Sequence, residues 1–152
     1  MKKGNYKTFA FTLLTSFVVM FFVMYTMIVN LGHFYFSTSK FYMTFLMVAP
    51  MALIMLAFMT GMYKSKKKNA LIVILCIVVF VGFFALLRNQ TFVGDKAYMR
   101  GMIPHHSAAI MTSKNAELTD PEVRELAEEI IRSQREEIAE MKRILERKEN
   151  EE

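Results

Sequence analysis

The residues of this chain best suited to chemistry lie together in the stretch MRGMIPHHSAAIM, residues 99–111. This stretch holds the chain's only adjacent histidine pair, His105 and His106, and three of its fourteen methionines. Imidazole and thioether groups are ligands for soft metal ions, Cu(I) above all, and a thioether binds without losing a proton. The stretch therefore predicts a soft-metal site.

A later helical stretch carries polar residues where its apolar stripe should continue. Gln134 and Glu137 occupy positions at which Leu or Ile is expected, and burying them is unfavourable unless they find partners. We expect the two stretches to fold as an antiparallel hairpin about Leu118. Met102 then lies level with Gln134. Met99 lies level with Glu137, so the polar exceptions of both helices are expected to meet at one height.

The predicted site combines thioethers and imidazoles from both helices, and Gln134 and Glu137 would orient the imidazole rings. The same register sets His106 level with Ile130. The alternative is a purely structural network, in which the histidines bond these polar residues to fix the helix register and the methionines fill the core. No nucleophile paired with a base occurs, so we expect no enzyme. The predicted metal ligands are Met99, Met102, His105, His106 and Met141.

Two amphipathic helices must position these residues. The first is predicted over 96–116, with a kink at Pro104. The second is predicted over 121–148, where Thr119 and Glu122 form a capping box. Two helices make a small core, so we expect two copies to combine into a four-helix bundle. Packing of the hairpin on its own membrane spans or on another protein is the alternative.

Three uncharged apolar runs precede this hairpin, over about 8–31, 43–62 and 70–87. Crossing a bilayer takes about 20 helical residues, so each run predicts a transmembrane helix. Residues 1–87 contain eight lysines and no acidic residue, whereas all fourteen acidic residues lie from Asp95 onward. The sequence therefore predicts an all-α protein with a membrane domain over 1–87 and a two-helix domain over 88–152.

The lysines predict the orientation of the spans. Three lysines precede the first span and four lie within 64–68, whereas only Lys40 lies between the first and second spans. By the positive-inside rule, the N-terminus of this multi-pass protein of the cell membrane is cytoplasmic and the domain over 88–152 is extracytoplasmic. The net charge of +5 thus reflects membrane-edge lysines and predicts no nucleic-acid partner. His33, in the outer loop, is expected to be solvated, with assistance to the site as the alternative.

The two helical motifs together resemble the family called domain of unknown function 305. The resemblance covers roughly Asp95 to Leu145 and leaves the three spans outside it. It implies a ferritin-like helical bundle, and some relatives are extracytoplasmic copper-binding proteins linked to copper resistance, with Met and His as ligands. The residues that carry the resemblance are Tyr98, Met102, Ile103, His105, His106, Ala109, Ile110, Leu126, Ala127, Ile130, Gln134, Glu137, Ile138 and Met141.

Residues and resemblance together predict a membrane-anchored, extracytoplasmic metal-binding protein. It would capture Cu(I), or Ag(I), as a homodimer, and would buffer the ion or pass it to a copper exporter or another membrane protein. The competing hypothesis is a structural or interaction module, whose His, Gln and Glu cluster only fixes the helix register and which recruits a partner membrane protein.

Overall fold

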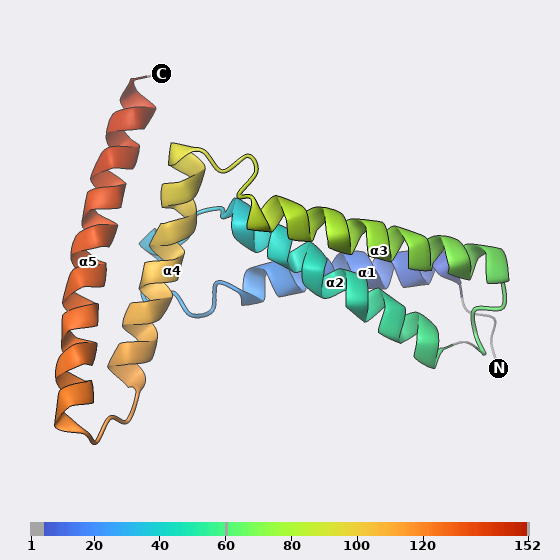
Figure 1. Cartoon of the computed structure of the whole chain (residues 1–152), viewed down its shortest axis with the longest axis horizontal. Coiled ribbons are helices and arrows are strands. Elements are labelled where there is room, and N and C mark those ends of the chain that lie inside the picture. Colours follow the sequence, from blue (N-terminus) through green and yellow to red (C-terminus); the bar gives the residue numbers. More distant parts are fainter. Residues whose placement is uncertain (1–4, 60, 152) are drawn as a thin grey trace. The chain divides into compact units, whose positions relative to one another are not determined.

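The computed structural model describes residues 5–59 and 61–151, and every regular element in these ranges is helical (Figure 1). The all-α prediction is thereby confirmed. The chain forms two compact units, one of Met1–Val23 with Ser39–Thr91 and one of Met24–Thr38 with Phe92–Glu152. The elements are α1 (Tyr6–Val23), the short 3-10 helix η1 (Leu31–His33), α2 (Thr38–Phe58), α3 (Lys66–Arg88), α4 (Asp95–Asn115) and α5 (Pro121–Asn150).

The first unit consists of α1, α2 and α3, all three long and apolar enough to cross a membrane. Phe9, Ala52 and Cys76 bring the three helices into one small core. Most of their other apolar side chains, such as that of Phe58, face outward. A water-soluble protein would bury such a surface, whereas a bilayer covers it without cost. The composition of this unit is therefore that of a membrane domain.

The first helix ends earlier than the apolar run 8–31 predicts. Beyond it, the Tyr25 hydroxyl donates a hydrogen bond to the Tyr35 carbonyl, and the Ser37 amide donates to the Tyr25 hydroxyl, both at 3.0 Å. These bonds hold the chain in a loop where a continued helix would have bonded to itself. Residues 24–38, which we call the strap, consequently belong to the second unit and not to the membrane unit.

The other two apolar helices begin earlier than the hydrophobic runs predict. α2 starts at Thr38 and α3 at Lys66. The Ser65 hydroxyl caps α3 by accepting a hydrogen bond from the Lys68 amide at 3.4 Å. Because of this cap, three lysines of the charged run form the first turn of α3.

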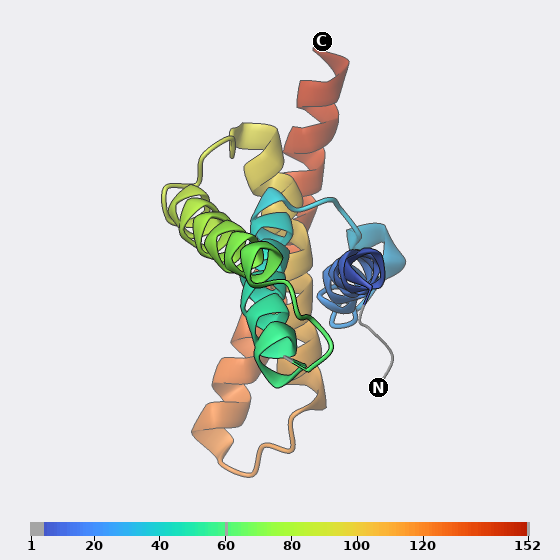
Figure 2. The ribbon, with the colours of Figure 1, turned by 90° about the vertical axis from the view of Figure 1, so that its right-hand side faces the viewer.

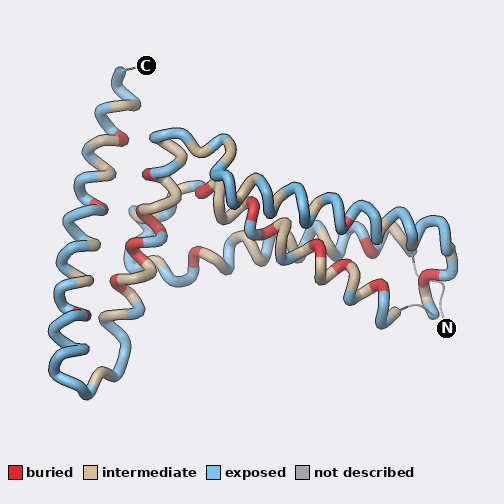
Figure 3. Tube along the Cα trace, in the orientation of Figure 1, coloured by how far each residue is buried: buried red, intermediate tan, exposed pale blue. Residues whose placement is uncertain are grey.

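In the second unit, α4 and α5 run side by side as an antiparallel hairpin, in both views of the molecule (Figures 1 and 2). Met99, Ile103 and Ile110 of α4 pack against Ile138 and Leu145 of α5. Their three- and four-residue spacing puts them on one stripe of each helix, and Figure 3 shows the buried positions recurring along α4. This stripe is the core of the second unit, which we call the outer unit after the side of the membrane that the lysines predict for it.

Two details of the hairpin differ from the sequence prediction. Asp120, and not Thr119, caps α5, since its carboxylate accepts from the amides of Glu122 and Val123. The chain over 116–120 is extended at both ends, and it therefore advances further per residue than a helical turn. α5 consequently begins beyond the end of α4 (Figure 1).

The displaced start of α5 shifts the register between the helices. His106 bonds Glu137, although it was expected level with Ile130, and Asp95 bonds Lys148. α4 runs through the fully buried Pro104 without a break.

The two flanks of the hairpin differ in what covers them. On one flank the strap lies against α4, where the Val29 amide donates to the Ser107 hydroxyl at 2.8 Å and a side chain at Gly101 would meet Ser37. On the other flank, which we call the open flank, two grooves run between α4 and α5. Met102 faces the open flank and Ser107 the strap, since five residues correspond to about 140° around a helix.

Candidate functional site

The site centres on His106, whose side chain is 10% exposed at the boundary between α4 and α5. Its Nδ1 lies 2.8 Å from the backbone carbonyl of Met102, one turn earlier in α4. A carbonyl oxygen only accepts, so the hydrogen-bond pattern assigns a proton to Nδ1. The ring is therefore fixed with Nε2 directed toward α5.

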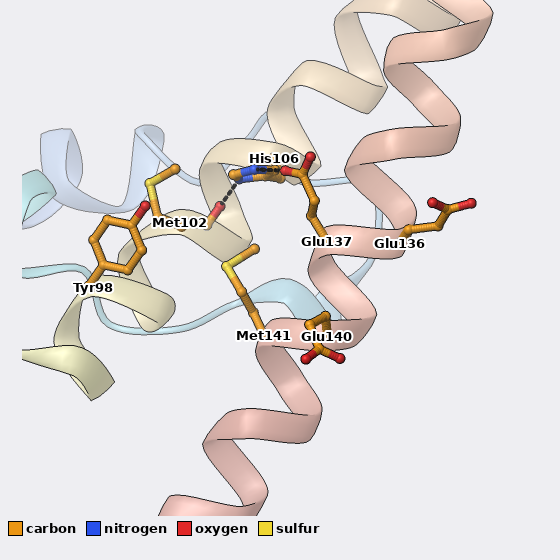
Figure 4. A pocket seen from close by; sticks show the side chains of 7 residues that line it. All are labelled: Tyr98, Met102, His106, Glu136, Glu137, Glu140 and Met141. Carbon is orange, nitrogen blue, oxygen red and sulfur yellow. Dashed lines mark hydrogen bonds and ion pairs between the residues drawn. The ribbon is translucent and has the colours of Figure 1, made fainter.

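Glu137 of α5 meets this nitrogen. Its Oε2 lies 2.6 Å from His106 Nε2 (Figure 4). Its Oε1 accepts a hydrogen bond from the Ser133 hydroxyl at 2.7 Å. The bond from Ser133, and then the bond to His106, lower the pKa of Glu137 below its ordinary value. An ionised carboxylate so close to Nε2 requires a shared proton between them, which makes this a charge-assisted hydrogen bond.

The histidine and its neighbours line a solvent-open groove of about 600 Å³ on the open flank. Two thioethers, an imidazole and a phenol supply its inner surface, while carboxylates stand along the α5 side (Figure 4). Such a groove offers soft donor atoms beside a row of carboxylates on α5, a combination that suits a thiophilic cation. The lining residues are Tyr98, Met102, His106, Glu136, Glu137, Glu140 and Met141.

The structure brings together only part of the predicted ligand set. Met102, His106 and Met141 line the same groove, as the sequence predicts. Met99 is 6% exposed and belongs to the core between the helices. His105 is exposed, with its ring centroid 5.9 Å from that of His106, and it does not line the groove.

Of the two polar residues expected to orient the imidazoles, one lines the groove and the other does not. Glu137 bonds His106, whereas Gln134 is half-buried on α5 and lies outside the lining of the groove. Sequence reasoning missed Ser133, which holds Glu137 from one turn earlier on α5. The four-residue spacing of these two residues was the available signal. It also missed Ser107, whose strap partners are distant in sequence and left no local signal.

Carboxylate-rich metal sites find little support. Within 5–59 and 61–151, no group of three or more His, Cys, Asp or Glu side chains is arranged to hold a metal ion. Zinc sites are usually built from such groups. Met102 and Met141 provide donors of another kind, which suit Cu(I) better than a harder ion.

Comparison with known proteins identifies the family of this chain. Residues 85–152 match the family described as "Domain of unknown function (DUF305)". The chain is also similar to "Uncharacterized protein L153" of Acanthamoeba polyphaga mimivirus, with 37% identity over 118 residues and 76% of each chain covered. Since 85–152 comprises 68 residues, that similarity continues into the apolar helices. No solved structure is similar to this chain. The protein therefore belongs to the DUF305 family and carries its family domain behind three apolar helices.

Proposed function

We propose that this protein is a membrane-anchored, extracytoplasmic binder of Cu(I), or of Ag(I), that captures and buffers the ion or passes it to a partner membrane protein such as an exporter. One observation carries the proposal. An imidazole held in one orientation and two thioethers, from Met102 and Met141, line the same groove, which opens to solvent. This donor set fits a soft monovalent ion.

His106 would bind the ion through Nε2, because its Nδ1 proton is held by the Met102 carbonyl. The ion would displace to solvent the proton shared between Nε2 and Glu137, and Glu137 would keep its bond to Ser133. Thioether and imidazole ligation stabilises the reduced state of copper. Met102, His106 and Met141 are the inner ligands of this proposal, and Met99 and His105 stay predictions of the sequence.

The proposed orientation rests on the ends of the spans. The strap leaves α1 and enters α2, whereas α4 follows α3, and strap and hairpin form one compact unit. Three crossing helices leave these two segments on the same side of a bilayer, in agreement with that unit. The lysines of 64–68 and Lys7 belong to the other side, which the positive-inside rule assigns to the cytoplasm.

We also propose that two copies pair through the open flank. Leu126 and Val123 are 56% and 46% exposed there, beside a second groove of about 300 Å³ near the hairpin turn. The strap already covers the other flank, so a second hairpin has this side to pack against. A pair would bury both apolar patches in a four-helix bundle.

The test is a Cu(I) titration of the full chain in detergent micelles, under reducing conditions and against a competing chelator. Wild type should bind saturably, and His106→Gln, Met102→Leu and Met141→Leu should each weaken binding. Met111→Leu is the matched control, because this methionine lies on α4 outside the groove lining. Equal affinity of wild type and all three groove variants would refute the proposal.

The second candidate is the structural module, and the bonding of His106 favours it. Both ring nitrogens already have partners, and the chain from Ser133 through Glu137 to His106 ties α5 to α4. Under this hypothesis His106→Gln lowers the melting temperature, while wild type shows no saturable Cu(I) binding. Binding by wild type that is lost in a variant with unchanged helicity decides for the metal site.

A further inference from the structure

The strap is fastened to α4 at the residue next to the proposed ligand His106. Ser107 is fully buried, and its hydroxyl oxygen lies 2.8 Å from the Val29 amide and 2.9 Å from His33 Nδ1. Val29 directly precedes Asn30, the N-cap of η1, and His33 is the last residue of η1. A single hydroxyl of α4 therefore holds two points of the strap.

The hydrogen bonds of this hydroxyl favour one protonation state of His33. The Ser107 oxygen accepts the Val29 N–H, so its own proton is free to be donated. Among the residues that the structure describes, His33 Nδ1 is the acceptor found for that proton. A neutral ring with its proton on Nε2 gives both the Ser107 hydroxyl proton and His33 Nδ1 a partner.

We propose that His33 and Ser107 are positioning residues for His106, and that they form a proton-sensitive latch that fastens the strap to α4. Its bearing on metal binding rests on the function proposed above. The latch itself rests only on the contacts of the outer unit.

Protonation of His33 would weaken the arrangement, although Nδ1–H could still donate to the second lone pair of the Ser107 oxygen. The ring would then present an N–H at Nδ1, and the Ser107 hydroxyl would lose the acceptor of its proton. Lys142 of α5 is the charged group that faces His33, and from α4 the ring meets the uncharged Ser107. A second positive charge beside Lys142 is unfavourable, so protonation pushes the strap away from both helices.

The direction in which the pKa of His33 is shifted agrees with a neutral ring at this junction. Burial, and then the charge of Lys142, lower this pKa below its ordinary value of 6.5. The folded protein therefore takes up this proton less readily than the unfolded chain does. The latch is at full strength above pH 6.5, and it weakens as the pH falls from there toward the lowered pKa.

The latch acts on the site through the backbone of α4. Ser107 and His106 are consecutive, so the strap and the groove hold opposite flanks of the same helical turn. While Ser107 is held by the strap, α4 keeps the rotation that directs His106 toward Glu137. Release of the strap frees that rotation, and the groove then loses its fixed geometry.

Hydrogen–deuterium exchange of the full chain in micelles, without metal, tests the latch. Exchange of peptides within 24–38 is compared at neutral pH and at about pH 5, after correction for the intrinsic rate. Wild type should lose about tenfold of its protection in acid. His33→Asn keeps an acceptor near the Nδ1 position and cannot be protonated, so it should stay protected at both pH values. Ser107→Ala should be unprotected at both.

His105→Asn is the matched control, because this exposed histidine lies outside the latch, and it should respond to pH as wild type does. An equal acid response of wild type and His33→Asn would overturn the latch. Cu(I) titration of wild type, His33→Asn and Ser107→Ala at neutral pH then tests the coupling. Weaker binding by Ser107→Ala supports it, whereas unchanged binding refutes it. Absence of binding in wild type would refute the metal function and leave the exchange result standing.

Discussion

The two hydrogen-bonded histidines of the outer unit differ in the role of Nδ1. His33 accepts at Nδ1 from Ser107, whereas His106 donates from Nδ1 to the Met102 carbonyl. The partner of each ring decides this difference, since a hydroxyl can donate and a carbonyl cannot. Nitrogen-15 spectra of labelled histidine distinguish an unprotonated Nδ1 from a protonated one. One histidine therefore suits a latch, and the other presents Nε2 to a ligand.

Glu137 should make the stability of the outer unit depend on acid. Its pKa is lowered by the Ser133 bond first and by His106 second, so its stabilising effect is present above the ordinary value of 4.5. This effect is lost as the pH falls through the lowered pKa. We expect Ser133→Ala to show a smaller fall in melting temperature than wild type between neutral pH and about pH 3 in circular dichroism. A parallel fall in both proteins would contradict this account.

Truncation of the Ile103 side chain should strongly destabilise the core between α4 and α5. It is 0% exposed and packs in the cluster between α4 and α5. Ile103→Ala should destabilise the outer unit by about 2–5 kcal/mol, because it leaves a cavity that a helix pair fills poorly. Leu31→Ala, at a side chain that is 86% exposed, should change stability by less than about 0.5 kcal/mol. Denaturant unfolding in micelles measures both, and equal effects would disprove the assigned core.

The sequence could predict part of the site at the level of residues. Met102, His106 and Met141 do share a groove, because three- and four-residue spacing fixes which helix face a side chain joins. The predicted register, that is, which residues of α4 and α5 lie level with each other, was wrong. The register depends on the path of the turn between the helices and not on helix geometry. His106 therefore meets Glu137, and Met99 enters the core.

At the scale of secondary structure, the N-terminus of α5 offers a direct test of which residue caps this helix. Asp120→Ala removes two hydrogen bonds to the first turn and should cost about 1 kcal/mol. Thr119→Ala, at the cap that the sequence favoured, should be nearly neutral. Thermal melts of the full chain compare the two variants. A larger effect at Thr119 would restore the capping box.

The long helices of this protein could be predicted from the sequence, and the strap could not. Apolar runs and amphipathic stripes are local signals, and α3, α4 and α5 lie close to where these signals predict them. The strap is apolar too, so it reads as a continuation of the first span. Its loop is stabilised by Tyr25 within the strap and by Ser107 from α4, and a distant partner leaves no trace in a local pattern.

For the whole molecule, pairing through the open flank is the property to measure. Leu126→Glu places a charge in the proposed interface and should convert a dimer into a monomer in light scattering of the micelle complex. Leu31→Glu is the control, at a more exposed leucine on the strap. A wild-type monomer, or a Leu126→Glu dimer, would reject pairing through this flank.

The strap also makes the outer unit discontinuous along the chain. Val29 and Ser107, which bond to each other, are 78 positions apart, and all of α2 and α3 lies between them. During synthesis the strap is made before α2, α3 and α4. In the proposed topology, its polar groups therefore stay hydrated until α2 and α3 have been inserted and α4 can bond to them. In the proposed topology, the outer unit can be completed only after both α2 and α3 have crossed the membrane. A chain with one span missing would leave strap and hairpin on opposite sides, where neither can fold fully, and it would be open to proteolysis.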